Sequence, residues 1–214
     1  MIFHKLAQIY KERSPDKLSL IKSAALYNAA LTRSPIREEI EENLQRLCRH
    51  ILEEAGAEIA NADLVKKANE IKKKVVDMRN SVKEKLKSLR EAAGYSEEEI
   101  SREDQETQRT RCIKRIQDEI YSSYSGLMGE ISDYCNHVMG EPPCKFSVVG
   151  MGSLSRKENS VFSDFEHMIL LEDIDDEDPS YESKLEYFRW FSTVFHVIVI
   201  NLQEQFFQAL TLFA

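Results

Sequence analysis

The chain has 214 residues, of which 42% are hydrophobic and 31% are charged, and its formal net charge is −8. This composition is typical of a helix-rich globular protein and excludes a disordered chain. The acidic balance excludes a protein that coats nucleic acid with its whole surface. The length allows one large or two small domains, and seven Gly with five Pro favour long helices over a many-turned β architecture.

The four cysteines show no paired metal-ligand spacing, and no signal peptide is recognised before them. We therefore expect reduced, mostly buried thiols in an intracellular, cytoplasmic protein. The apolar run over residues 194–200 is far too short to cross a membrane, so a membrane partner is not expected.

Residues 1–140 are predicted to form a helical hairpin followed by two long helices. Ser14-Pro15 and Ser34-Pro35 have the cap and first-turn proline typical of helix starts. Apolar residues then recur at spacings of three and four, and the second of these helices is expected to end near Gly56. A third helix is predicted over residues 57–93. Residues 94–108 are polar and acidic and are expected to be an exposed connection. A fourth helix then runs to the break at residues 140–143.

Basic side chains dominate residues 66–90, where ten Lys and Arg stand against three acidic residues. One interpretation is a groove for nucleic acid or phosphate. The other is a solvated helix face balanced by acidic segments elsewhere, and we favour it. No aromatic residue interrupts the run before Tyr95, so a stacking platform for single strands is not supported.

Two short apolar runs, residues 146–149 and 168–171, predict two strands joined by a loop or a short helix. The first run leads through Gly150 to Gly152-Ser153. After a gap of ten residues, Asp164-Phe165-Glu166 opens the second. Because alternate residues of a strand point to one face, Asp164 and Glu166 are expected to direct both carboxylates towards the Gly-Ser turn.

This arrangement indicates a site for phosphate and a divalent metal. A Gly-Ser turn lets the backbone approach phosphate oxygens closely. Two carboxylates on one face repel each other unless a cation lies between them, and Mg²⁺ prefers such oxygens, with Mn²⁺ as the other possibility. Two such ions roughly 4 Å apart clamp the attacking and leaving oxygens of a nucleotidyl transfer. Arg156 and Lys157 lie between the two halves and are expected to offset the charge of a triphosphate.

The stretch GSLSRKENSVFSDFE resembles the signature of the DNA polymerase β-like nucleotidyltransferase superfamily. It is most similar to the PII-uridylyltransferase-like branch, which tends to read G-S-x-x-R-x-E followed by Ser-Asp-hydrophobic-Asp/Glu. The matching residues are Gly152, Ser153, Arg156, Glu158, Ser163, Asp164 and Glu166. The resemblance implies that Gly152 and Ser153 hold the nucleotide phosphates, and that Asp164 and Glu166 bind the metals.

The sequence departs from that family at one point. The family supplies a third carboxylate from a later strand, which helps to bind metal and to activate the attacking hydroxyl. Here an acidic loop and one helical segment follow Glu172, and Glu172, Asp173 and Glu204 are poor substitutes. Either the chain is a truncated form of a longer enzyme or it has lost catalysis, and we favour truncation.

The predicted fold is α+β. An N-terminal helical region (residues 1–140) precedes a partial nucleotidyltransferase-type mixed sheet with flanking helices (residues 141–214). Pro179-Ser180 introduces an aromatic helix that is expected to pack in the core, and a protein partner is expected to cover the apolar C-terminal segment. His167 is expected to pack on the opposite face of its strand.

The predicted function is Mg²⁺-dependent transfer of a nucleoside monophosphate from a nucleoside triphosphate to a protein, nucleic acid or small-molecule acceptor. The alternative is a catalytically inactive helical interaction protein with a relict nucleotide pocket.

Overall fold

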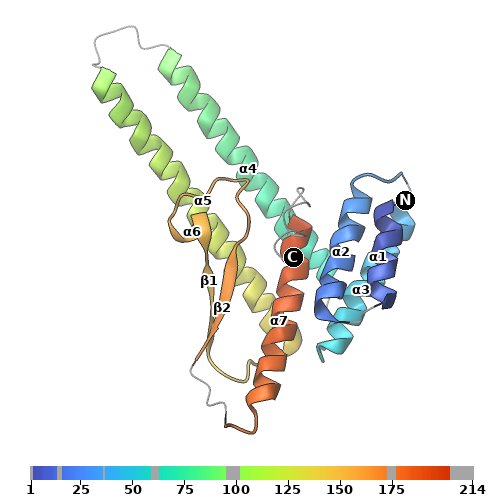
Figure 1. Ribbon diagram of the computed structural model, residues 1–214. Coiled ribbons are helices and arrows are strands. Elements are labelled where there is room, and N and C mark those ends of the chain that lie inside the picture. Colours follow the sequence, from blue (N-terminus) through green and yellow to red (C-terminus); the bar gives the residue numbers. More distant parts are fainter. Residues whose placement is uncertain are drawn as a thin grey trace.

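The computed structural model describes residues 2–13, 16–35, 37–58, 63–94, 102–172 and 177–202 (Figure 1). Seven helices and two strands lie in these ranges. In chain order they are α1 (Ile2–Arg13), α2 (Lys17–Leu31), α3 (Arg37–Glu54), α4 (Leu64–Gly94), α5 (Arg102–Met139), β1 (Phe146–Gly150), α6 (Gly152–Ser155), β2 (His167–Leu171) and α7 (Tyr181–Leu202).

The predicted fold class is confirmed: a helical region precedes a small sheet that is flanked by helices. The two described strands pair antiparallel, with Phe146 opposite Leu171 and Gly150 opposite His167. The Gly-Ser turn follows Gly150 at one end of this strand pair. Glu172 follows Leu171 at the other end, so the length of the two strands separates the turn from Glu172.

The N-terminal helices α1, α2 and α3 pack together on one side of the molecule (Figure 1). The side chain of Asp16 caps α2 by accepting a hydrogen bond from the Ser19 amide at 2.9 Å. The expected cap, Ser14-Pro15, lies outside the described residues. The sequence patterns did not predict α1. Near the end of α3, Gly56 has a φ of 69°, as expected of a glycine that ends a helix.

Helices α4 and α5 extend together beyond the rest of the fold (Figure 1). Glu130 of α5 binds the ammonium groups of both Lys67 and Lys74 of α4, at 2.7 and 2.5 Å. Lysines of the basic run therefore meet carboxylates of the neighbouring helix. For Lys67 and Lys74, this supports the interpretation of a balanced, solvated face over that of a phosphate groove.

The prediction that residues 94–108 form a connection is wrong for most of its length. The structure places residue 94 at the end of α4 and begins α5 at Arg102, while residues 95–101 lie outside the described ranges. The physical reason is that residues 102–108 contain Glu and Gln and no Gly or Pro, and acidic side chains stabilise the N-terminal turns of a helix.

The core is built around α7, which lies between the N-terminal helices and the sheet (Figure 1). Its residues 193–195 and 197–200 are all buried. The ring of Phe146 on β1 packs against Phe188 and Phe191, with ring centroids 5.2 and 5.0 Å apart. The prediction that this aromatic segment packs in the core is therefore confirmed for α7, whereas residues 206–214 lie outside the described ranges.

One hydrophobic cluster includes residues from α1 to α7. The division at residues 140 and 141 therefore stays a prediction. None of the described helices is long and apolar enough to cross a membrane. Cys48 and Cys135 are buried free thiols, and burial raises the pKa of Cys48 to about 12.

Candidate functional site

The Gly-Ser turn follows directly from β1. Met151 is extended, with φ −115° and ψ 177°, and the short helix α6 begins at Gly152. The Met151 amide donates a hydrogen bond to the carbonyl oxygen of Glu166 at 2.8 Å, which extends the β1–β2 pairing past Gly150. This bond holds the backbone of Glu166 beside the turn.

The side chain of Glu166 lies directly against Gly152. A Cβ atom on residue 152 would overlap Oε2 of Glu166, and Gly152 also has a positive φ of 56°. Both facts require glycine at this position. The structure therefore brings together one carboxylate and the turn, two of the features that the sequence predicted.

The sequence analysis expected Asp164 and Glu166 to lie within the second strand, and the structure places both residues just before it. β2 begins at His167, and the two acidic residues belong to the segment that leads into it. Burial nevertheless alternates along this segment: Asp164 is half-buried, Phe165 is 8% exposed and Glu166 is exposed. β2 starts at His167, opposite the last residue of β1, and Glu166 is joined beyond this pair to Met151, the N-cap residue of α6, by one hydrogen bond.

Two side chains outside the motif anchor the segment over residues 156–166. Nε of Arg79 on α4 and the hydroxyl of Tyr124 on α5 both donate to the carbonyl oxygen of Val161, at 3.0 and 3.1 Å. The ring of Phe165 packs on Tyr124 with centroids 4.7 Å apart. The sequence did not indicate this role of Tyr124, although a buried tyrosine hydroxyl usually needs a partner.

Asp164 lies close enough to Tyr124 to change its titration. Burial raises the pKa of Tyr124, Arg79 opposes the rise, and the Asp164 carboxylate adds to it. Asp164 belongs to a segment whose backbone is held at Val161 by side chains of α4 and α5. Asn159 of the same segment is 2% exposed, and neither polar atom of its side chain has a partner among the described residues. Buried polar groups without partners are rare and call for an explanation, such as a bound water or ligand.

Arg156 and Lys157, the two side chains predicted to bind phosphate, are exposed and already have neighbours. Nε of Arg156 lies 2.8 Å from Oε2 of Glu158, and both side chains are 60% exposed. Nζ of Lys157 lies 4.8 Å from the centroid of the Tyr121 ring. A cavity of about 470 Å³ lies between these residues and α5, and Lys114 of α5 also lines it. A phosphate that reaches this cavity would therefore compete with Glu158 for Arg156.

A second cavity, of about 550 Å³, lies between α5 and the end of β1. Gly150, Leu154 and Ser155 form one wall, and Tyr121 and Ser125 belong to the other. The turn and α6 thus have open space on the side that faces α5.

The metal expectation rests on few ligands. The described residues contain no group of three or more His, Cys, Asp or Glu side chains that could hold a metal ion. Asp164 and Glu166 still fit Mg²⁺ as hard oxygen ligands, because this ion often binds proteins through one or two carboxylates together with substrate phosphates.

Glu172 is the one candidate for the third carboxylate that lies within the described residues, and it is not near the turn. Glu172 lies at the other end of the hairpin, where it accepts a hydrogen bond from the Lys145 amide at 3.0 Å. Asp173 and Glu204 are outside the described residues. His167 packs on α7 as expected, with its ring centroid 4.5 Å from that of Phe195.

Comparison with protein families gave a match, and it covers the C-terminal half of the chain. Residues 101–204 match the family model described as "Putative nucleotidyltransferase DUF294". The matched span contains α5, the hairpin, the turn and α7, so this part of the chain is similar to a nucleotidyltransferase domain. Comparisons with curated proteins and with solved structures gave no match.

Proposed function

We propose that this protein transfers a nucleoside monophosphate from a nucleoside triphosphate to a hydroxyl group of a protein, nucleic acid or small molecule. The observation that carries the proposal is the contact of the Glu166 carboxylate with Gly152, at the point where the motif requires acid and turn to meet. The family match over residues 101–204 supports the same reaction class.

In this proposal the backbone of Gly152 and Ser153 holds the phosphate chain, since residue 152 has no side chain to keep a phosphate away. Arg156 and Lys157 neutralise its far end. Asp164 and Glu166 hold a divalent metal, Mg²⁺ or Mn²⁺, whose chemistry is to neutralise the charge that develops on the phosphate oxygens. Arg79 and Tyr124 act as positioning residues, because they fix the segment that presents Asp164.

The reaction forms a bond between the acceptor oxygen and the α-phosphorus and breaks the bond from that phosphorus to the pyrophosphate. The acceptor hydroxyl loses its proton, and pyrophosphate leaves. In the superfamily that the motif resembles, a third carboxylate assists this proton loss. The proposal therefore places that group outside residues 102–172 and 177–202.

The binding test compares the double variant Asp164→Ala/Glu166→Ala with wild type in titrations of each nucleoside triphosphate, with Mg²⁺ and with EDTA. We expect the double variant to lose the Mg²⁺-dependent part of binding while its circular dichroism spectrum is unchanged. Glu182→Ala is the matched control, because this carboxylate is exposed in the first turn of α7. Equal Mg²⁺-dependent binding by the double variant and wild type would contradict the metal assignment.

The transfer test incubates the protein with each labelled nucleoside triphosphate and cell extract, followed by detection of the labelled acceptor. Label that appears with wild type and not with the double variant supports the enzyme. Mg²⁺-dependent nucleotide binding with no label on any acceptor would instead favour an inactive interaction protein with a relict pocket.

A further inference from the structure

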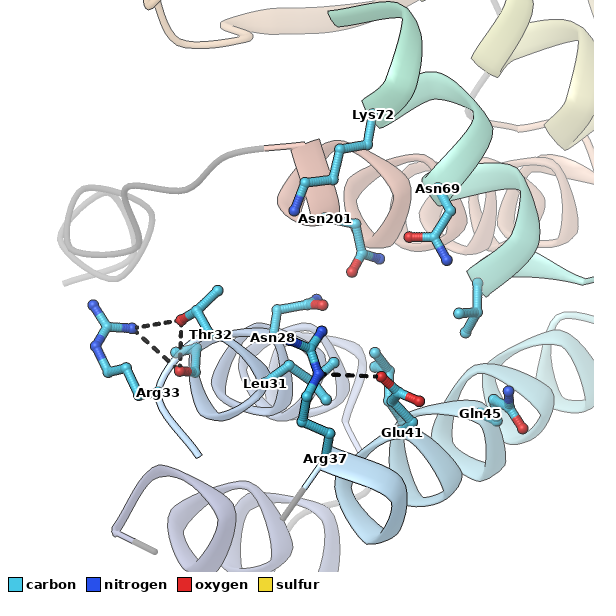
Figure 2. Close-up of a pocket in the computed structure, with 13 residues that line it drawn as sticks. Asn28, Leu31, Thr32, Arg33, Arg37, Glu41, Gln45, Asn69, Lys72 and Asn201 are labelled. Atoms are coloured by element: carbon cyan, nitrogen blue, oxygen red, sulfur yellow. Dashed lines mark hydrogen bonds and ion pairs between the residues drawn. The ribbon is translucent and has the colours of Figure 1, made fainter. Parts of the chain in front are cut away.

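A polar cavity of about 480 Å³ lies among the helices, away from the residues of the nucleotidyltransferase motif (Figure 2). It is lined by the end of α2, by α3, by the first turns of α4 and by Asn201 near the end of α7. Its volume is within the range of small-molecule sites. Nine of its thirteen lining residues have polar side chains, so an apolar ligand does not fit it.

The charge of the lining is positive. Arg33, Arg37 and Lys72 contribute three cations, and Glu41 contributes the one carboxylate of the set. The Arg37–Glu41 pair is loose, with Nε and Oε1 3.7 Å apart and side chains that are 65% and 52% exposed. An excess of two positive charges matches the charge of a phosphate monoester near neutral pH, which is about −1.5 to −2.

Lys72 is the most informative of these cations. It is half-buried, and no hydrogen bond or ion pair of its ammonium group occurs within the described ranges. Three other lysines of the same helix, at positions 67, 74 and 85, pair with carboxylates of α5. The Lys72 ammonium therefore keeps its three N–H donors and its charge for a ligand in the cavity.

The lining residues face each other across the space. Figure 2 shows Lys72, Asn69 and Asn201 on one side of the cavity, with Asn28 and Arg37 on the other. The amides of Asn28 and Asn201 each donate one hydrogen bond to the carbonyl oxygen four residues earlier, at 3.1 and 2.7 Å. These bonds fix both amides, while each keeps one N–H and the oxygen for other partners.

We propose that this cavity is a binding site for a small phosphate-bearing molecule. Lys72 and Arg37 hold the phosphate from opposite walls. The amides of Asn28, Asn69 and Asn201 contact the polar remainder of the ligand. The site shares no residue with the nucleotidyltransferase motif. Its lining residues come from the N-terminal helices, from α4 and from the end of α7.

Isothermal titration with orthophosphate, pyrophosphate and AMP, at constant ionic strength and in EDTA, tests this site. The titrations use the full-length Asp164→Ala/Glu166→Ala variant, so that binding at the motif does not contribute. We expect at least one of the three probes to bind at one site per chain. The three arms distinguish free phosphate, pyrophosphate and a phosphate ester as the source of the recognised group.

In this background Lys72→Met keeps the aliphatic stem and removes the charge, and we expect it to weaken binding by about tenfold or more. Lys73→Met is the matched control, because its neighbouring side chain is exposed and does not line the cavity, and binding should be unchanged. The proposal is wrong if none of the three probes binds, if Lys72→Met binds as tightly as its parent, or if Lys73→Met weakens binding equally.

Discussion

Glu166 can lie against the Gly-Ser turn because residue 152 has no side chain. The same residue has a φ of 56°, which L-amino acids with a side chain rarely adopt. The requirement for glycine thus has a local backbone cause and a long-range cause, which is the approach of a carboxylate from fourteen positions later. The motif spacing indicates the first cause, and only the fold reveals the second.

Gly152→Ala should impair both stability and nucleotide binding. The positive φ costs a residue with a Cβ about 1 to 2 kcal/mol, and the new methyl group would displace the Glu166 carboxylate. We expect a lower free energy of unfolding in urea and weaker Mg²⁺-dependent nucleotide binding.

Gly126→Ala is the control for that substitution, because residue 126 lies within α5 and a Cβ there meets no atom within 4 Å. It should leave nucleotide binding unchanged and raise stability slightly, since alanine favours a helix over glycine. If Gly152→Ala bound nucleotide as wild type does, the contact between Glu166 and the turn would have no part in binding.

At the scale of elements, the sequence predicted both strands, a loop or a short helix between them, and the break after α5, because these depend on local patterns. β1 is one residue longer than the apolar run over residues 146–149, and β2 begins one residue before the run over 168–171. The anchor of Arg79 and Tyr124 on Val161 could not be predicted, because these residues are 82 and 37 positions apart from it. Asp164 and Glu166 lie just before β2 and not within it, because the periodicity of a sequence does not show at which residue the pairing of two strands begins.

The interface between β2 and α7 should respond to pH through His167. Burial lowers the pKa of His167 to about 4, and the neighbouring His196, whose ring centroid is 4.9 Å away, adds to the effect. Burial also lowers the pKa of His196. The contact of the His167 ring nitrogen Nδ1 with the carbonyl oxygen of Phe165, at 3.2 Å, acts in the opposite direction and raises the pKa of His167.

The folded state therefore binds fewer protons than the unfolded state between pH 6.5 and 4. The stability contributed by a neutral His167 is present above pH 6.5 and is lost as the pH falls towards 4. At about 1.4 kcal/mol per pKa unit, the loss is of the order of 3 kcal/mol.

Urea unfolding of wild type and His167→Phe at pH 7.5, 6.5, 5.5 and 4.5 measures this loss. The phenylalanine ring preserves the packing on Phe195 and cannot bind a proton. The variant should lose less stability than wild type as the pH falls. Equal losses in the two proteins would assign the acid sensitivity to other groups.

At the scale of the whole molecule, α7 links the two parts that the sequence analysis separated. Its apolar composition predicted burial, and the structure buries it. The sequence could not identify which elements cover it, because the contacts join distant positions. For example, Lys17 Nζ lies 2.5 Å from Oε1 of Glu186, and the two residues are 169 positions apart.

Residues 141–214 should consequently not fold alone. Without α2, α4 and α5, the buried face of α7 would be exposed to water, and a two-stranded hairpin is not stable by itself. We expect this fragment to aggregate or to unfold without a cooperative transition in urea, as followed by circular dichroism. The full chain should show one cooperative transition.

Co-expression of residues 1–140 with residues 141–214 is the control, and we expect it to restore a soluble complex by rebuilding the shared core. A cooperative transition of the isolated fragment would instead establish the boundary at residue 140 as a true domain boundary.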